Sequence, residues 1–358
     1  MTGRHARRSK VPLGIVVAVL LLSVAVGIMS RSPATGPADA VAPRAGTASA
    51  APGSEALTPV RPEGAQEAAP PEESGGRLVI HGAGDVNVDP TYIPNFRAHG
   101  YGYAWSGLGG LFRRDDLTVI NLECAVSDLG GAVPKEFNFR GDPAALPSMR
   151  EAGVEVANLG NNHAYDYGPD ALVDTIRNLR RNDIAPVGAG ADEDEALSPA
   201  LLEVNGWTVA VVGFDQVVDP YPDAIATEAK PGTAAGHDAG LMVRAIRAAD
   251  RGADIVIVTI HWGVELDTQP RAEQVALGHR FVDAGADVIF GHHSHRLQPM
   301  STYRRRPIFW GLGNFVWPSL SVAGSTTAVA EVVVSKHGVY RGELLPAYIQ
   351  SSGHPVLR

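Results

Sequence analysis

From Arg77 onward, short apolar runs alternate with amphipathic stretches along the chain. The apolar runs are rich in β-branched residues and predict strands, because such residues suit a pleated, buried sheet. The predicted strands are residues 78–83, 118–122, 154–159, 208–214, 255–260, 288–290, 307–310 and 328–334. The amphipathic stretches have helical spacing and predict helices over residues 143–152, 169–181, 239–251 and 271–284. This alternation predicts an α/β fold with largely parallel central strands, and the last two runs predict a second sheet or an antiparallel edge.

The N-terminal segment differs from the rest of the chain. Residues 1–10 are basic, and residues 11–29 form an uncharged, mostly apolar run of 19 residues. A helix of this length can cross a bilayer, and its basic flank predicts that the rest of the chain lies outside the cytoplasm. We therefore expect a single-pass anchor in the cell membrane. The small-x-small sequence at residues 38–40 leaves a cleaved signal peptide, and thus secretion, as the alternative.

Residues 30–76 consist mainly of Ala, Pro, Gly, Ser and Glu. Such a composition buries too little apolar surface to offset chain entropy, so we expect a disordered linker. No repeat and no second linker interrupts the sequence after it, which predicts one folded domain over residues 77–350.

Charge and cysteine content exclude several classes of function. The formal net charge is −9, and the first ten residues contribute +4, so the remainder carries −13. This balance argues against nucleic-acid binding, which needs a basic surface. Cys124 is the only cysteine, which excludes a disulfide within the chain and any cysteine-based metal site.

Polar motifs follow five of the predicted strands, and a sixth comes after residues 307–310. In α/β folds, ligands bind at the carboxyl ends of the strands, so we expect these side chains to meet. The motifs are Gly84-Asp85-Val86-Asn87, Asn121-Leu122-Glu123, Asn161-Asn162-His163, His261-Trp262-Gly263, Gly291-His292-His293-Ser294-His295 and Gly313-Asn314-Phe315.

Oxygen donors mixed with imidazoles suit Mn, Fe or Zn ions. Glu123 follows a central strand and is the natural bridge between two such ions. In an extended chain, alternate residues point the same way, so His293 and His295 can converge whereas His292 cannot join them. Each residue alone also has a structural interpretation: Asp85 as a cap, Asn162 as a turn residue and His163 as a hydrogen-bonded structural imidazole.

Taken in order, these motifs resemble those of the CapA family of capsule-synthesis proteins, in the calcineurin-like metallophosphoesterase superfamily. The resemblance implies a four-layer α/β/β/α sandwich. It implies that His163 is the catalytic imidazole, which protonates a leaving group or stabilises the transferring group. It implies that Asn87, His292 and Asn314 line or support the site. The implied metal ligands, for one or two ions, are Asp85, Glu123, Asn162, His261, His293 and His295.

The chain departs from the family pattern at four positions. Asn87 stands where a metallophosphoesterase usually has the histidine of an Asp-x-His motif, and Glu123 stands where an aspartate is common. These two departures leave the number of metal ions open. Ser294 replaces the usual proline and Gly311 replaces the usual serine, with little expected effect.

The family is implicated in the synthesis, export or anchoring of poly-γ-glutamate capsule. The resemblance therefore implies a metal-dependent, hydrolase-like protein that acts on an anionic polymer or a phosphorylated envelope substrate, together with membrane synthase and transport subunits. Two alternatives remain open. One is a non-catalytic scaffold that holds the carboxylates of the polymer. The other is an envelope phosphatase or phosphodiesterase outside capsule synthesis.

Overall fold

The computed structural model describes residues 76–217, 224–319, 321–335 and 338–358. The anchor predicted over residues 11–29 lies outside the described residues, as does nearly all of the linker predicted over residues 30–76. Among the helices of the described residues, none is both long enough and apolar enough to span a membrane.

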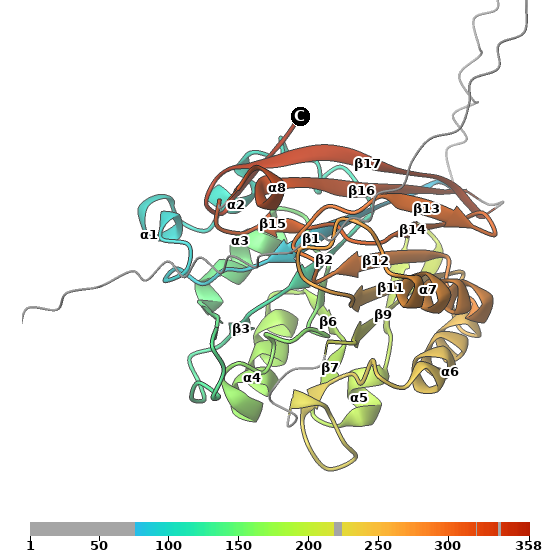
Figure 1. The fold of residues 1–358 in the computed structure, drawn as a ribbon, viewed down its shortest axis with the longest axis horizontal. Coiled ribbons are helices and arrows are strands. Elements are labelled where there is room, and N and C mark those ends of the chain that lie inside the picture. Colours follow the sequence, from blue (N-terminus) through green and yellow to red (C-terminus); the bar gives the residue numbers. More distant parts are fainter. Residues whose placement is uncertain (1–75, 218–223, 320, 336–337) are drawn as a thin grey trace, which may run out of the picture. The chain divides into compact units, whose positions relative to one another are not determined.

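The first sheet has the strand order β18-β17-β16-β1-β2-β5-β6, with β15 also paired to β1 (Figure 1). β1, β2, β5 and β6 run parallel, and β16, β17 and β18 add antiparallel strands at one edge. The strand bounds are β1 Leu78–Val86, β2 Leu117–Leu122, β5 Val156–Asn158, β6 Ala185–Val187, β15 Asn314–Val316, β16 Thr326–Ser335, β17 Gly338–Ser351 and β18 His354–Leu357.

The second sheet has the strand order β13-β14-β12-β11-β9-β8. Its central strands β9, β11, β12 and β14 run parallel, and β8 and β13 close its two edges antiparallel. The bounds are β8 Ala200–Val204, β9 Trp207–Asp215, β11 Ile255–His261, β12 Val288–His292, β13 Met300–Tyr303 and β14 Arg306–Phe309. Short pairs complete the strands: β3 Ala125–Val126 with β4 Arg140–Gly141, and β7 Ala189–Gly190 with β10 Gly232–Thr233.

The helices are mostly short. Their bounds are α1 Asn95–His99, α2 Tyr103–Ser106, α3 Leu146–Glu151, α4 Gly168–Arg181, α5 Glu193–Leu197, α6 Ala239–Asp250, α7 Ala272–Ala284 and α8 Val322–Ser325, and a 3₁₀ turn at Pro143–Ala145 leads into α3. Figure 1 shows α6 and α7 side by side next to the second sheet, and α4 lies near β3, β6 and β7 of the first half of the chain.

Alternating side chains on the strands build three apolar cores. Ile257 of β11 packs in the core shared by the two sheets, whereas its neighbour Val258 packs in the core under α6 and α7. Val119 and Ile120 of β2 divide in the same way between the inter-sheet core and the core that includes α4. Because both faces of these central strands are covered, they are continuously apolar, as the sequence shows. The predicted α/β class with parallel central strands is confirmed.

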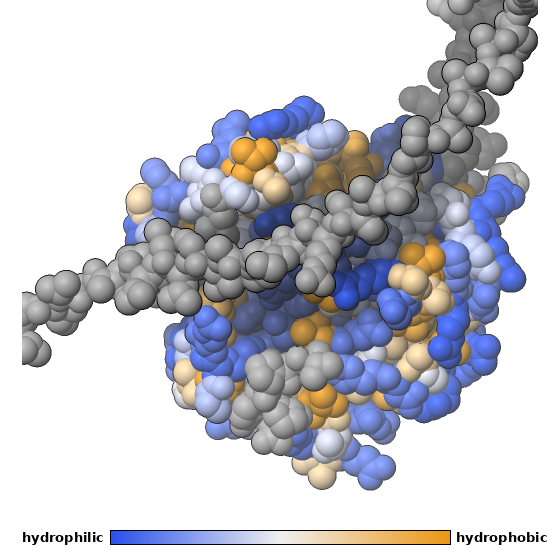
Figure 2. All heavy atoms as spheres, viewed as in Figure 1, coloured by the Kyte–Doolittle hydropathy of each residue, from blue (hydrophilic) through white to orange (hydrophobic). Residues whose placement is uncertain are grey.

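The described surface carries no continuous apolar face in the view of Figure 2, where hydrophobic residues form small separate patches among hydrophilic ones. The exposed large hydrophobic side chains of the described residues are Leu129, Phe137, Leu201, Val264, Leu266 and Val322. Single exposed apolar residues of this kind are common on soluble domains.

Candidate metal centre

The strand ends named in the sequence analysis come together in the structure. In the first sheet, the strand register pairs Asp85 with Asn121 and Asn121 with Asn158. In the second sheet it pairs His261 with His292. Parallel strands place their carboxyl ends at one edge of a sheet, and contacts between histidines of the second sheet and carboxylates of the first join the two edges.

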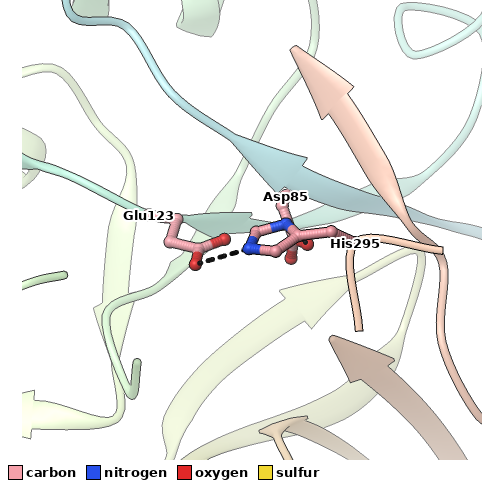
Figure 3. Close-up of side chains that lie close together, drawn as sticks. All are labelled: Asp85, Glu123 and His295. Atoms are coloured by element: carbon pink, nitrogen blue, oxygen red, sulfur yellow. Dashed lines mark ion pairs between the residues drawn. The ribbon is translucent and has the colours of Figure 1, made fainter. Parts of the chain in front are cut away.

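Asp85, Glu123 and His295 form the centre of this cluster (Figure 3). One ligand atom from each residue lies within 4.8 Å of the others. His295 Nδ1 is 3.1 Å from Asp85 Oδ2, and His295 Nε2 is 3.8 Å from Glu123 Oε1. Both carboxylate side chains are fully buried. Two acids and an imidazole at this spacing can share one divalent ion.

Two further histidines, His261 and His293, lie beside Glu123. His261 Nε2 is 3.4 Å from Glu123 Oε1, and His293 Nδ1 is 3.1 Å from His261 Nε2. Glu123 Oε1 therefore lies within 4 Å of both His261 and His295. This position agrees with a carboxylate that bridges two ions.

The hydrogen bonds of the cluster provide a test of whether a cation fits there. Buried polar atoms in proteins are almost always hydrogen-bonded. Here Asp85 Oδ2, Glu123 Oε1 and Asn162 Oδ1 are buried without a hydrogen-bond partner. Three unpartnered oxygens of ligand type, those of Asp85 and Glu123 beside imidazoles, match the donor set of a divalent metal. The residues present thus fit the metal that the motifs imply.

Burial and neighbouring charges move the pKa values of the two acids in opposite directions. Burial raises the pKa of Glu123 well above its usual value, and the adjacent Asp85 carboxylate raises it further. Burial also opposes the ionisation of Asp85. However, the close contact and charge of His295, together with the charge of His292 and the hydrogen bond from Asn121, lower the pKa of Asp85 overall. Glu123 is therefore the more weakly acidic of the two carboxyl groups.

The imidazoles of the cluster favour the neutral, metal-binding form. Burial lowers the pKa of His292 and of His293 to about 4 in each case. Burial lowers the pKa of His261 well below its usual value, and the nearby histidines lower it further. His295 is the exception: burial lowers its pKa, but the adjacent Asp85 carboxylate, the hydrogen bond with Asn314 and the charge of Glu265 together outweigh burial and raise the pKa.

The backbone conformation of the His293–His295 segment differs from the predicted one. His293 has a φ of 84° and His295 a φ of 49°, so the segment is not the extended chain from which their convergence was predicted. Their ring centroids are nonetheless 6.2 Å apart. Left-handed backbone at residues other than glycine is unusual and gathers at functional sites. The convergence is present, but the reason given for it is wrong.

The three predicted supporting residues lie in or beside the cluster. His292 Nδ1 is 3.7 Å from Asp85 Oδ1, and its Nε2 is 3.0 Å from the hydroxyl of Thr259. Asn314 Oδ1 is 2.8 Å from His295 Nδ1. Asn87 is fully buried, its Oδ1 accepts from the backbone N–H of Asp89 at 2.8 Å, and its Nδ2 has no partner.

His163, the predicted catalytic imidazole, is held by a carboxylate. Its Nδ1 is 2.8 Å from Asp166 Oδ2, and its ring centroid is 4.4 Å from that of Phe139. Burial lowers the pKa of His163, while Asp166 acts in the opposite direction. Asp166 and Lys135 are absent from the predicted site residues. Asp166 follows His163 by three residues, and this short spacing is the signal that points to it.

A buried amide network joins the cluster. It comprises Asn121 and Asn161, which belong to the predicted motifs, and Asn158, which does not. Asn121 Nδ2 lies 2.9 Å from Asp85 Oδ1 and 3.2 Å from His261 Nδ1. Asn121 Oδ1 accepts from the side-chain amides of Asn158 and Asn161 at 3.0 and 3.2 Å. This network links Asp85 of the first sheet to His261 of the second.

Comparison with known proteins gives consistent matches. The family model described as "Bacterial capsule synthesis protein PGA_cap" matches residues 79–319. The capsule biosynthesis protein CapA of Bacillus anthracis is 35% identical over 219 residues, which are 60% of this chain and 53% of that protein. The PGA biosynthesis protein CapA of Bacillus subtilis (strain 168) is 32% identical over 245 residues, which are 68% of this chain and 64% of that protein. The chain thus covers less than two thirds of either relative.

Among solved structures, the Haemophilus influenzae NAD nucleotidase matches with a TM-score of 0.45 and 14% identity, covering 79% of this chain and 60% of that one. A likeness this distant carries no argument about function.

Proposed function

The chain belongs to the bacterial capsule synthesis protein family PGA_cap, and from this premise we propose that it acts in poly-γ-glutamate capsule synthesis, export or anchoring through a metal-dependent site. We further propose the four-layer α/β/β/α sandwich of the metallophosphoesterase type as its fold. The observation that carries the metal-dependent part is the set of unpartnered buried oxygens of Asp85, Glu123 and Asn162 where the strand ends meet.

The residues that would hold one or two Mn, Fe or Zn ions are Asp85, Glu123, Asn162, His261, His293 and His295. Such ions supply Lewis acidity and activate water for attack on a phosphoryl or carbonyl centre. Asn121 keeps Asp85 and His261 in place from beneath, and Glu123 lies between the two groups of ligands.

His163 would exchange protons with the substrate. Its Nδ1–H donates to Asp166, which leaves Nε2 as the ring atom that can face a reacting group. Because burial favours the neutral imidazole, Nε2 can accept a proton and later return it to a leaving group.

The substrate class we propose is an anionic polymer or a phosphorylated envelope molecule, handled together with membrane synthase or transport subunits. Outside the first ten residues the chain carries −13, so an anionic substrate needs local positive charge at the site. Bound metal ions would provide that charge. The proposed location is outside the cytoplasm, tethered to the cell membrane by residues 11–29 and the linker of residues 30–76, with secretion after cleavage as the alternative.

The test measures metal content together with hydrolysis of an aryl phosphate monoester and diester. It compares the full chain with its His163→Ala and His293→Ala variants, and His279→Ala is the matched control because His279 stacks on Tyr303. We expect bound metal and turnover in the wild type and in the control, loss of turnover in both site variants and reduced metal content in His293→Ala only. Metal without turnover of either ester or of poly-γ-glutamate would favour the scaffold. Absence of metal after reconstitution would contradict the proposal.

A further inference from the structure

Lys135 lies in the loop between β3 and β4 and contacts the turn that contains His163. Lys135 Nζ donates to Asp166 Oδ1 at 2.7 Å and also to the backbone carbonyl of Asn162. Its side chain is only 7% exposed, and that of Asp166 is fully buried. The ammonium group thus joins the loop to two residues of the turn, one of which is a proposed metal ligand.

Asp166 links Lys135 to His163. Its Oδ2 accepts from His163 Nδ1 at 2.8 Å and from the backbone N–H of Phe139 at 2.7 Å, while Oδ1 is held by Lys135. The carboxylate therefore has a fixed plane, and the direction of the His163 ring follows from that plane. If the ammonium were removed, Asp166 would be a buried acid without its cation, held only at Oδ2, and the plane of its carboxylate would be less firmly fixed.

The type of residue is also informative. The chain has four lysines among its 30 basic residues, so arginine is its ordinary cation. A compact ammonium group can donate in divergent directions to a carboxylate and a carbonyl, whereas a planar guanidinium group donates within one plane. A lysine at this buried position matches the geometry of its two acceptors.

We propose that Lys135 is a positioning residue of the site. It holds the Asp166 carboxylate and the Asn162 carbonyl, and through them it sets the orientation of the His163 imidazole and the Asn162 side chain. This inference rests on the proposed function, because it assigns those two side chains a role in the reaction.

The experiment uses the full chain with Lys135→Met, Lys135→Ala and the matched control Lys230→Met, whose lysine lies on the segment between β9 and β10. Turnover of the aryl phosphate diester at saturating Mn²⁺ gives kcat and KM. Independently of turnover, ¹⁵N-histidine NMR of the metal-free protein reports the Nδ1 proton of His163, assigned by its absence in His163→Gln.

We expect Lys135→Met to lose about 10- to 100-fold in kcat, as is typical for residues that orient ligands, with KM within about twofold of wild type. We expect the Nδ1 proton signal to weaken or shift. Propylammonium added to Lys135→Ala is expected to restore part of kcat, because it supplies the missing ammonium group. Lys230→Met should match the wild type in every measurement.

Wild-type kcat and an unchanged His163 signal in Lys135→Met would overturn the inference. If the wild type itself shows no turnover, the proposed function fails while the NMR measurement still decides the role of Lys135. If Lys135→Met does not fold, Lys135→Gln takes its place, since glutamine keeps a hydrogen-bond donor but lacks the charge. The same two readouts then decide.

Discussion

Gly84 and Gly313 pack backbone against backbone at the edge of the site: a Cβ atom on Gly84 would lie 2.0 Å from the carbonyl oxygen of Gly313. That carbonyl accepts a hydrogen bond from the N–H of Asp85 at 2.9 Å. The close approach of β1 and β15 therefore fixes the backbone of Asp85, and it requires glycine at position 84.

From this relationship we predict that Gly84→Ala lowers the free energy of unfolding by about 1–3 kcal/mol, the usual cost of overpacking. It should also weaken Mn²⁺ binding by about 10- to 100-fold, because Asp85 is displaced. Chemical denaturation and calorimetric titration measure the two effects. Gly102→Ala is the control, since nothing lies within 4 Å of a Cβ atom there. Equal metal affinity in Gly84→Ala and wild type would show that the backbone contact does not position Asp85.

The raised pKa of Glu123 predicts that metal affinity depends on pH. The carboxyl must lose its proton to bind a cation, and its pKa lies well above the ordinary value of 4.5. Below that raised pKa, affinity for Mn²⁺ should fall about tenfold per pH unit, with release of a proton on binding. Calorimetric titrations in buffers of different ionisation enthalpy measure the proton release. In Glu123→Gln this proton release should disappear, and an affinity independent of pH in the wild type would contradict the assignment.

Much of this site could be predicted because strand ends of parallel sheets converge. That rule, applied to apolar runs, found Asp85, Glu123, His261 and the His293–His295 segment without knowledge of their contacts. The contacts of Asn121, which belongs to one of the predicted motifs, were harder to predict. Asn121 lies within a buried strand, and nothing in the pattern of a buried strand says that its amide contacts two ligands from different sheets.

Other features depend on contacts that no local pattern encodes. Lys135 reaches Asp166 across 31 residues, so its role requires the folded loop. The positive φ angles of His293 and His295 lie in the turn that connects β12 to the segment before β13, and even histidine, which adopts such angles more often than most residues, does so rarely. The antiparallel edge of the first sheet was predicted only as far as residues 328–334. β17 contains Gly342 and Pro346, which weaken a strand pattern.

The burial of two acids side by side predicts that the metal-free site destabilises the fold. Glu123 is fully buried beside Asp85, and its pKa is raised, so above pH 4.5 folding must either keep this acid protonated or bury its charge, a cost that a neutral amide of the same shape avoids. We therefore expect metal-free Glu123→Gln to be more stable than wild type by about 0.5–2 kcal/mol, as is common when a functional residue is removed. Mn²⁺ should raise the melting temperature of the wild type by more than that of the variant. Glu228→Gln, on an exposed turn, is the control. If the metal-free variant is less stable than the wild type, the contacts of Glu123 stabilise the fold by more than its burial destabilises it.

The raised pKa of Glu155 predicts a second pH dependence, that of the stability of the fold. Burial raises its pKa to about 7, with Asp115 adding to the effect, against an ordinary value of 4.5. Because the folded-state pKa is the higher one, its contribution to stability is complete below pH 4.5 and is lost as pH rises through 7. Glu155→Gln titrates nowhere in this range and keeps an acceptor for the N–H of Thr118, so it should gain on wild type between pH 4.5 and 7 by on the order of 1 kcal/mol. The side chain is 23% exposed and also pairs with Arg150, which limits the gain.

Urea unfolding of both proteins from pH 4 to 8 measures the difference, with the exposed Glu151→Gln as control. A difference that stays constant across this range would exclude a raised pKa at Glu155.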